Sequence, residues 1–144
     1  MKKLLYPALC FIGAVLLHVA CKQTETSQEI EALNSAQAEK NYIKAIPGKN
    51  DTLSAADVQR GKVLIAYSDC YTCHTEKDRA KGPAFEDIAK RYPINDGYIE
   101  LLAQKIILGG TGAWGYPVMS PHPDISVTDA KTMVKYILSL KEKR

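Results

Sequence analysis

Two cysteines and a histidine stand close together in the middle of the chain, in the stretch Cys70-Tyr71-Thr72-Cys73-His74. The spacing Cys-x-x-Cys-His is typical of covalent haem attachment. Two thiols on one helical turn can form thioether bonds with the two vinyl groups of a porphyrin, and the adjacent imidazole then lies beneath the iron. We therefore predict one haem c, bound covalently through Cys70 and Cys73, with His74 as the proximal iron ligand.

Three other readings of the same residues compete with this one. A thioredoxin-like redox pair would stand in a βαβ setting, which the sequence lacks. A zinc site would need further ligands, but after removal of an N-terminal signal only His122 and Cys21 remain. A Cys70–Cys73 disulfide is compatible with the spacing but leaves His74 without a role.

The second axial ligand decides whether the iron can bind small molecules. Met119 lies in a Gly- and Pro-rich loop between Pro117 and Pro121, whose rings restrict the backbone around the thioether. Met133 has the spacing of a helix-core residue, and His122 stays open as a bis-imidazole alternative. We predict Met119, and Met/His ligation is the pattern that raises the haem potential.

Two strong protein ligands leave no open position for a small-molecule substrate at the iron. The sequence therefore indicates an electron-transfer protein and not an enzyme. An enzymatic or gas-sensing haem, in which Met119 binds weakly or not at all, is the first alternative. A haem subunit dedicated to one dehydrogenase is the second.

The predicted elements around this motif are all helical. A Ser54 cap opens a helix with apolar Val58, Val63, Leu64, Ile65 and Tyr67, which we expect to run directly into Cys70. A short helix around Phe85, Ile88 and Ala89 breaks near Pro93. The other predicted elements are a helix from Gly97 to Leu108 stopped by Gly109-Gly110, an irregular loop over 109–125, and a helix from Ser126 to Leu140.

No convincing strand pattern appears, so we predict an all-α domain of four to five short helices. The first and last helices should cross. A domain of about ninety residues with a long irregular loop has little aliphatic core of its own. A haem would supply the missing apolar volume.

The first twenty residues have the plan of an export signal: basic Lys2 and Lys3, an apolar run, and Ala20 before Cys21. The run is too short to favour a retained membrane anchor. Residues 16–21 resemble a bacterial lipoprotein signal, so we predict that residues 1–20 are cleaved and that Cys21 is lipidated. Ordinary cleavage nearby, which leaves Cys21 as a free thiol, is the alternative.

Residues 21–50 are polar and lack a sustained apolar face, which predicts a tether, although residues 29–45 have the composition of a helix. The haem domain is expected over 51–144. Loss of Lys2 and Lys3 would lower the formal net charge from +3 to about +1, which does not suggest nucleic-acid binding.

From about Ser54 to Lys141 the chain resembles the small bacterial class I cytochromes c, which act as respiratory electron shuttles. The resemblance is carried by the Cys-x-x-Cys-His motif and by four further segments. These are Gly82-Pro83-Ala84-Phe85, Leu102-Ala103-Gln104-Lys105-Ile106, Trp114-Gly115-Tyr116-Pro117-Val118-Met119 and the closing helix from Ala130 to Leu140.

The resemblance implies a class I cytochrome c fold and several residue roles. The Pro83 carbonyl should accept a hydrogen bond from the free ring nitrogen of His74. Lys105 and Trp114 should lie near the haem propionates; a solvent-facing lysine and a buried aromatic are the alternatives. Lys77, Arg79 and Lys81 form either a docking patch or a solvated loop, since acidic residues are interleaved with them.

The same reading gives partners and a location. We expect redox proteins as partners: a respiratory donor complex or dehydrogenase, and a terminal oxidase or reductase. The protein should be exported and held at the periplasmic side of a membrane, or elsewhere in the cell envelope, by its lipid anchor.

Overall fold

The computed structural model describes residues 27–31, 33–34, 43–115 and 117–141. The chain divides into two compact units, Met1–Asn41 and Tyr42–Arg144. In the first unit, residues 27–31 and 33–34 are helical and exposed. The predicted signal over 1–20 and the predicted lipidation site Cys21 lie outside the described residues.

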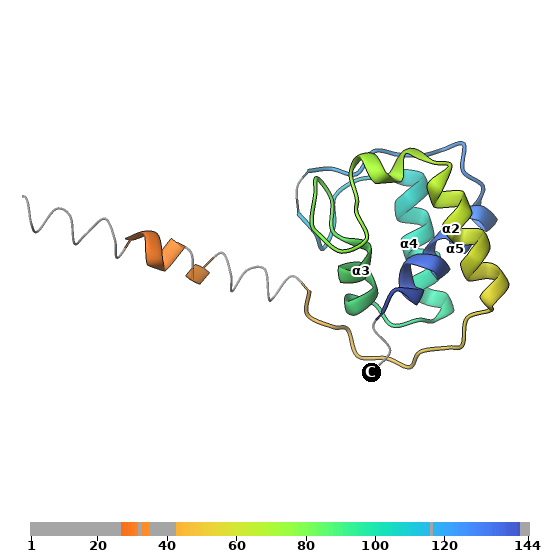
Figure 1. Ribbon diagram of the computed structural model, residues 1–144, viewed down its shortest axis with the longest axis horizontal. Coiled ribbons are helices and arrows are strands. Elements are labelled where there is room, and N and C mark those ends of the chain that lie inside the picture. Colours follow the sequence, from red (N-terminus) through yellow and green to blue (C-terminus); the bar gives the residue numbers. More distant parts are fainter. Residues whose placement is uncertain (1–26, 32, 35–42, 116, 142–144) are drawn as a thin grey trace, which may run out of the picture. The chain divides into compact units, whose positions relative to one another are not determined.

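The second unit is built from helices, which confirms the predicted all-α class. Its described elements are the α-helices α2 (Ala55–Ala66), α3 (Phe85–Arg91), α4 (Asp96–Leu108) and α5 (Val127–Ser139) and the 3₁₀ helix η1 (Asp69–Thr72) (Figure 1). In the described part of the chain, β structure is limited to an isolated antiparallel bridge between Gly110 and Met119.

Side-chain caps begin three of the helices. The hydroxyl oxygens of Ser54 and Ser126 accept from backbone N–H groups in the first turns of α2 and α5, at 3.4 and 3.1 Å. The Asn95 side chain does the same for α4, at 3.1 Å. Such caps satisfy N–H groups that have no partner within the helix. At the other end, α4 stops at Gly109, whose φ of 65° suits glycine.

The expectation that the first helix runs into Cys70 is wrong. Helix α2 ends at Ala66, and Ser68 has extended backbone before η1 begins. The Ser68 hydroxyl donates to the Leu64 carbonyl at 2.8 Å, which satisfies one of the last helix carbonyls as the chain turns away. The apolar residues of this segment face the core only in part, because Val63 and Tyr67 are 45% and 90% exposed.

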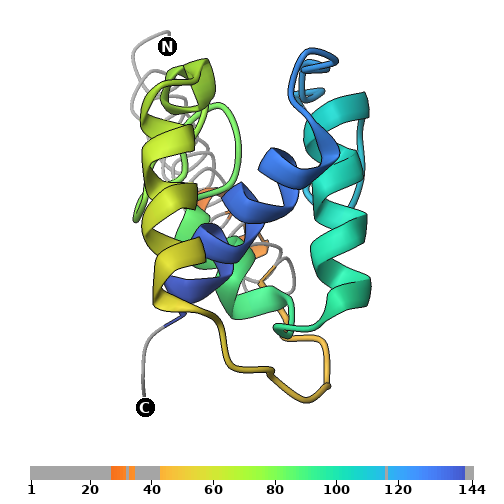
Figure 2. The same ribbon diagram turned by 90° about the vertical axis from the view of Figure 1, so that its right-hand side faces the viewer.

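Helix α5 forms the centre of the core and runs between α2 and α4 (Figure 2). Its residues Met133, Val134, Ile137 and Leu138 are buried, whereas Leu140 is half-buried. Helices α2 and α5 meet at Gly61, where a Cβ atom would stand 2.2 Å from the carbonyl oxygen of Thr132. Only a residue without a side chain permits this approach.

The second unit, Tyr42–Arg144, includes residues 43–50, which the sequence analysis assigned to the tether. Residues 43–53, which we call the N-terminal strap, form hydrogen bonds with the last residue of α3 and with the segment between α3 and α4. The bonds are Ile46 N–H to Arg91 O (2.8 Å), Asp51 N–H to Ile94 O (2.7 Å) and Ile94 N–H to Asn50 Oδ1 (2.8 Å). The strap residues Ile46 and Leu53 also pack against the core, but the polar residues between them leave no sustained apolar face in the sequence.

Candidate haem-binding site

The two cysteines of the motif lie on the turn formed by η1. Both are half-buried free thiols, so the disulfide alternative is not what the structure shows. The Cys70 carbonyl accepts from the N–H groups of Cys73 (3.2 Å) and His74 (3.0 Å), which places the three residues on one tight turn. Burial, and then the neighbouring Asp69 carboxylate, raise the pKa of the Cys70 thiol above its ordinary value.

The His74 ring is held on two sides. A Cβ atom on Gly82 would stand 2.5 Å from its Cε1 atom, so the ring lies against the glycine backbone. The Phe85 ring stacks on it with centroids 5.4 Å apart and planes 17° apart. Helix α3 positions Phe85, and the Gly82 N–H donates to the Cys73 carbonyl at 2.8 Å, which closes the loop over the motif.

The Nδ1 atom of His74 lies 2.8 Å from the Pro83 carbonyl oxygen, the contact that the resemblance implied. A carbonyl oxygen can only accept, so Nδ1 carries the proton. The other nitrogen, Nε2, then has the lone pair that a metal requires. Such a bond orients a ligating imidazole and makes it more basic.

An unpredicted cluster joins the loop after His74 to α5. One oxygen of the Glu76 carboxylate, Oε1, accepts from the hydroxyl groups of Tyr136 (2.7 Å) and Tyr71 (3.2 Å). Burial, together with the Glu76 contact, raises the pKa of the Tyr136 phenol well above its usual range. The sequence signal was the helical spacing of Tyr136 with Met133, because a buried tyrosine hydroxyl needs an acceptor.

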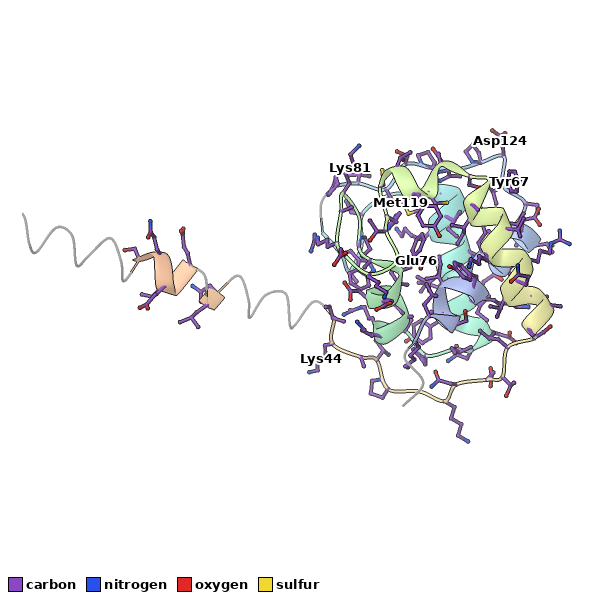
Figure 3. All side chains as sticks on the ribbon, in the orientation of Figure 1. Lys44, Tyr67, Glu76, Lys81, Met119 and Asp124 are labelled. Atoms are coloured by element: carbon purple, nitrogen blue, oxygen red, sulfur yellow. The ribbon has the colours of Figure 1, made fainter. Side chains whose placement is uncertain are left out.

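The loop that carries Met119 is fastened to the end of α4. The Gly110 N–H donates to the Met119 carbonyl at 2.8 Å, and the Met119 N–H donates to the Gly110 carbonyl at 3.2 Å. The neighbouring Gly109 lies so close that a Cβ atom would stand 2.5 Å from the same Met119 oxygen. Met119 is half-buried against the core, whereas Lys81 and Asp124 are exposed (Figure 3).

Lys105 lies beside the same loop and Trp114 lies within it, each with partners that the sequence did not predict. The Lys105 ammonium donates to the carbonyls of Gly109 (3.1 Å) and Thr111 (2.7 Å), so it is not simply a solvent-facing helix lysine. The Trp114 ring is half-buried, with the Arg91 guanidinium carbon 5.7 Å from its centroid.

His122, the alternative axial ligand, has both ring nitrogens engaged. Its Nδ1 lies 3.2 Å from the Ile106 carbonyl oxygen, and its Nε2 lies 3.1 Å from Oδ1 of Asp69. Lys77, Arg79 and Lys81 are exposed, and the exposed acidic Asp78 lies between two of them in the chain.

The residues present fit a covalently attached haem. Two free thiols and an imidazole share one turn, the imidazole is oriented by Pro83, and Gly82 leaves room for its ring. Within the described residues, no cluster of three or more His, Cys, Asp or Glu side chains could hold a separate metal ion. The donor set therefore matches haem better than zinc.

Comparison with known proteins agrees with this site. The family model Cytochrome c matches residues 58–141. Cytochrome c-552 of Nitrosomonas europaea is 37% identical over 89 residues, covering 62% of this chain and 86% of that protein. Cytochrome c-551 of Azotobacter vinelandii is 34% identical over 83 residues, covering 58% of this chain and 100% of that protein.

The crystal structure of Nitrosomonas europaea cytochrome c552 superposes with a TM-score of 0.52 at 38% identity, covering 56% of this chain and 99% of that one. Sequence and fold thus agree over nearly the whole length of these small proteins. The relatives are electron carriers, and the family binds one covalent haem c. The chain belongs to the cytochrome c family, as a small bacterial class I cytochrome that carries electrons on a single haem.

Proposed function

We propose that this cytochrome passes single electrons between respiratory-chain proteins, with its iron held by His74 and Met119 and its haem bonded to Cys70 and Cys73. The observation that carries the proposal is the bond between His74 Nδ1 and the Pro83 carbonyl, because it leaves Nε2 ready for iron. When bound, the haem supplies a ferrous–ferric couple that exchanges one electron.

The protein holds the two proposed iron ligands, His74 and Met119, in fixed positions. Gly82 and Phe85 confine the His74 ring from two sides, and the bridge to Gly110 fixes the backbone of Met119. His74 and Met119 would both stay bound to the iron in either oxidation state, so electron exchange would need no protein ligand to enter or leave.

The contacts of His122 support Met119 as the second ligand. Both His122 nitrogens face oxygen atoms of the protein, so ligation by either one would break a contact. Met119 is half-buried and packs against the core, as a thioether that faces an apolar cofactor should.

Lys105 and Trp114 are proposed neighbours of the haem propionates. Lys105 already holds two loop carbonyls close to Met119, and Trp114 lies beside the guanidinium of Arg91. Both positions place donors or positive charge near the loop that would cover the haem. Loss of either side chain should lower the reduction potential modestly without opening the iron.

We further propose that residues 1–20 direct export and that lipidated Cys21 tethers the protein at the periplasmic side of a membrane. The signal-like pattern supports this, and lipid chains provide stable anchoring. Among the described residues, no helix combines the length and hydrophobicity needed to cross a bilayer. A Cys21→Ser protein should leave the membrane fraction; retention there after signal removal would contradict the tether.

Carbon monoxide separates the carrier from the enzymatic or gas-sensing alternative. The reduced protein should not bind carbon monoxide at neutral pH, because Met119 occupies the iron. Binding, or a high-spin oxidised spectrum, would favour the alternative. Stoichiometric co-purification with one dehydrogenase would instead indicate a dedicated subunit.

A further inference from the structure

His122 contacts two elements that are far apart in the sequence. Its backbone N–H lies 3.2 Å from the Ile106 carbonyl oxygen and 3.1 Å from that of Ile107, in the last turn of α4. Its ring adds a second contact to Ile106, through Nδ1. Its Nε2 lies 3.1 Å from a carboxylate oxygen of Asp69, the first residue of η1.

We propose that His122 is a positioning residue that fastens the Met119 loop to α4 and, through Asp69, to the turn that carries Cys70 and Cys73. The proposal rests on the proposed ligation of iron by Met119. His122 stands three residues after Met119, and Asp69 stands directly before Cys70. One side chain therefore links the segment of the distal ligand to the segment of haem attachment.

The contact between His122 and Asp69 should favour a closed state of the Met119 loop, in which the thioether binds the iron. In the open state the thioether has left the iron. An external ligand reaches the iron only when Met119 has left it, so the ligand's apparent affinity is proportional to the open fraction. A bond that exists only in the closed loop lowers that fraction. Breaking it should tighten external ligand binding by the factor by which the open fraction rises.

The burial of Asp69 and His122 determines how much the loss of their contact should change the affinity for an external ligand. The Asp69 side chain is 70% exposed and that of His122 is 20% exposed, so water weakens the pair. Exposed ion pairs contribute little to stability. Loss of this one should therefore raise the affinity for an external ligand by about twofold to fivefold. The Asp69 change is also mild for folding, because the side chain lies at the surface.

The test is an imidazole titration of the oxidised holoprotein, followed by loss of the methionine-to-iron charge-transfer band. Asp69→Ala should bind imidazole about threefold more tightly than the wild type. Asp69→Asn keeps an acceptor oxygen and should give a smaller change. Asp124→Ala, at an exposed carboxylate in the same loop as His122, is the matched control and should leave the affinity unchanged.

A double-mutant cycle isolates the contact itself. In a His122→Ala background, Asp69→Ala should have no further effect on imidazole affinity. An Asp69→Ala effect equal to that of Asp124→Ala, or one that persists undiminished without His122, would overturn the proposal. If His122→Ala fails to retain haem, the comparison of the Asp69 variants with Asp124→Ala still decides whether the Asp69 contact affects imidazole affinity. A wild-type protein without the band would instead contradict Met119 ligation, a separate outcome.

Discussion

The imidazole of His74 lies directly against the backbone of Gly82, where a Cβ atom would stand 2.5 Å from Cε1 and 2.8 Å from Nδ1 of the ring. Real Cβ atoms do not approach so closely, so any side chain at residue 82 must displace the ring or the loop. The position of the proposed proximal ligand therefore depends on a glycine eight residues further along the chain.

Gly82→Ala should move the His74 ring away from its bond with Pro83. We expect a loss of about 1–3 kcal/mol in the free energy of unfolding and shifted His74 resonances in the NMR spectrum of the oxidised protein. Gly112→Ala is the control, because its Cβ would meet only Lys105, at 3.9 Å. Equal effects of the two changes would contradict the assigned role of Gly82.

Gly61→Ala should be strongly destabilising, because its Cβ would stand 2.2 Å from the Thr132 carbonyl oxygen and force α2 and α5 apart. Overpacking of this kind costs about 1–3 kcal/mol. Chemical denaturation measures this loss in the free energy of unfolding. Gly97→Ala makes the same change in α4 with only an ordinary contact at 3.5 Å, and should stabilise by about 0.5–1 kcal/mol. A tolerated Gly61→Ala would refute the close helix crossing.

Asn50→Ala should destabilise the domain even though residue 50 precedes α2. The change removes the acceptor of the Ile94 N–H, a bond of 2.8 Å. The expected loss is about 0.5–1.5 kcal/mol, measured by thermal unfolding. Asn50→Asp keeps an acceptor oxygen and should lose less. If deletion of residues 43–50 leaves the stability unchanged, the N-terminal strap is part of the tether and not of the fold.

Tyr136 predicts how stability depends on alkaline pH. Its pKa is raised in the folded state, so the neutral phenol is favoured there, whereas the unfolded chain ionises at about pH 10. Above that pH the unfolded state binds fewer protons, and the free energy of unfolding falls as pH rises. This part of the stability is fully present below about pH 10.

Tyr136→Phe should weaken that alkaline decline and should cost about 1.5–3 kcal/mol at neutral pH, because the bond to Glu76 is lost. Denaturant titrations at several pH values measure both effects. Tyr67→Phe changes an exposed tyrosine and is the control. An alkaline decline as steep as that of the wild type would show that Tyr136 is not responsible.

Local signals in the sequence predicted most of the helices, and the resemblance to class I cytochromes c implied the contact between His74 and Pro83. Ser54, Ser126 and Gly109 mark helix ends because caps and positive φ angles are local requirements. The break between α2 and η1 was missed, since the Ser68 bond to Leu64 replaces a continued helix without any proline or glycine.

Long-range polar contacts were also missed. The bonds from Glu76 to Tyr136 and from His122 to Asp69 join residues 60 and 53 positions apart. Charged residues in loops are usually solvated, so nothing in the sequence singles out these partners. The strap was assigned to the tether because its few apolar residues form no sustained face, and its contacts combine backbone groups with the Asn50 side chain.

A covalently bound haem with Met119 as the second iron ligand is what would make this protein a closed electron carrier. The most direct measurement is the absorption spectrum of the exported protein, recorded native and oxidised and again after denaturation, for the wild type and for Met119→Ala. We predict that haem stays with the denatured chain in both, and that the methionine-to-iron charge-transfer band is present in the wild type and absent in Met119→Ala. Release of haem on denaturation, or an unchanged band in Met119→Ala, would contradict the account.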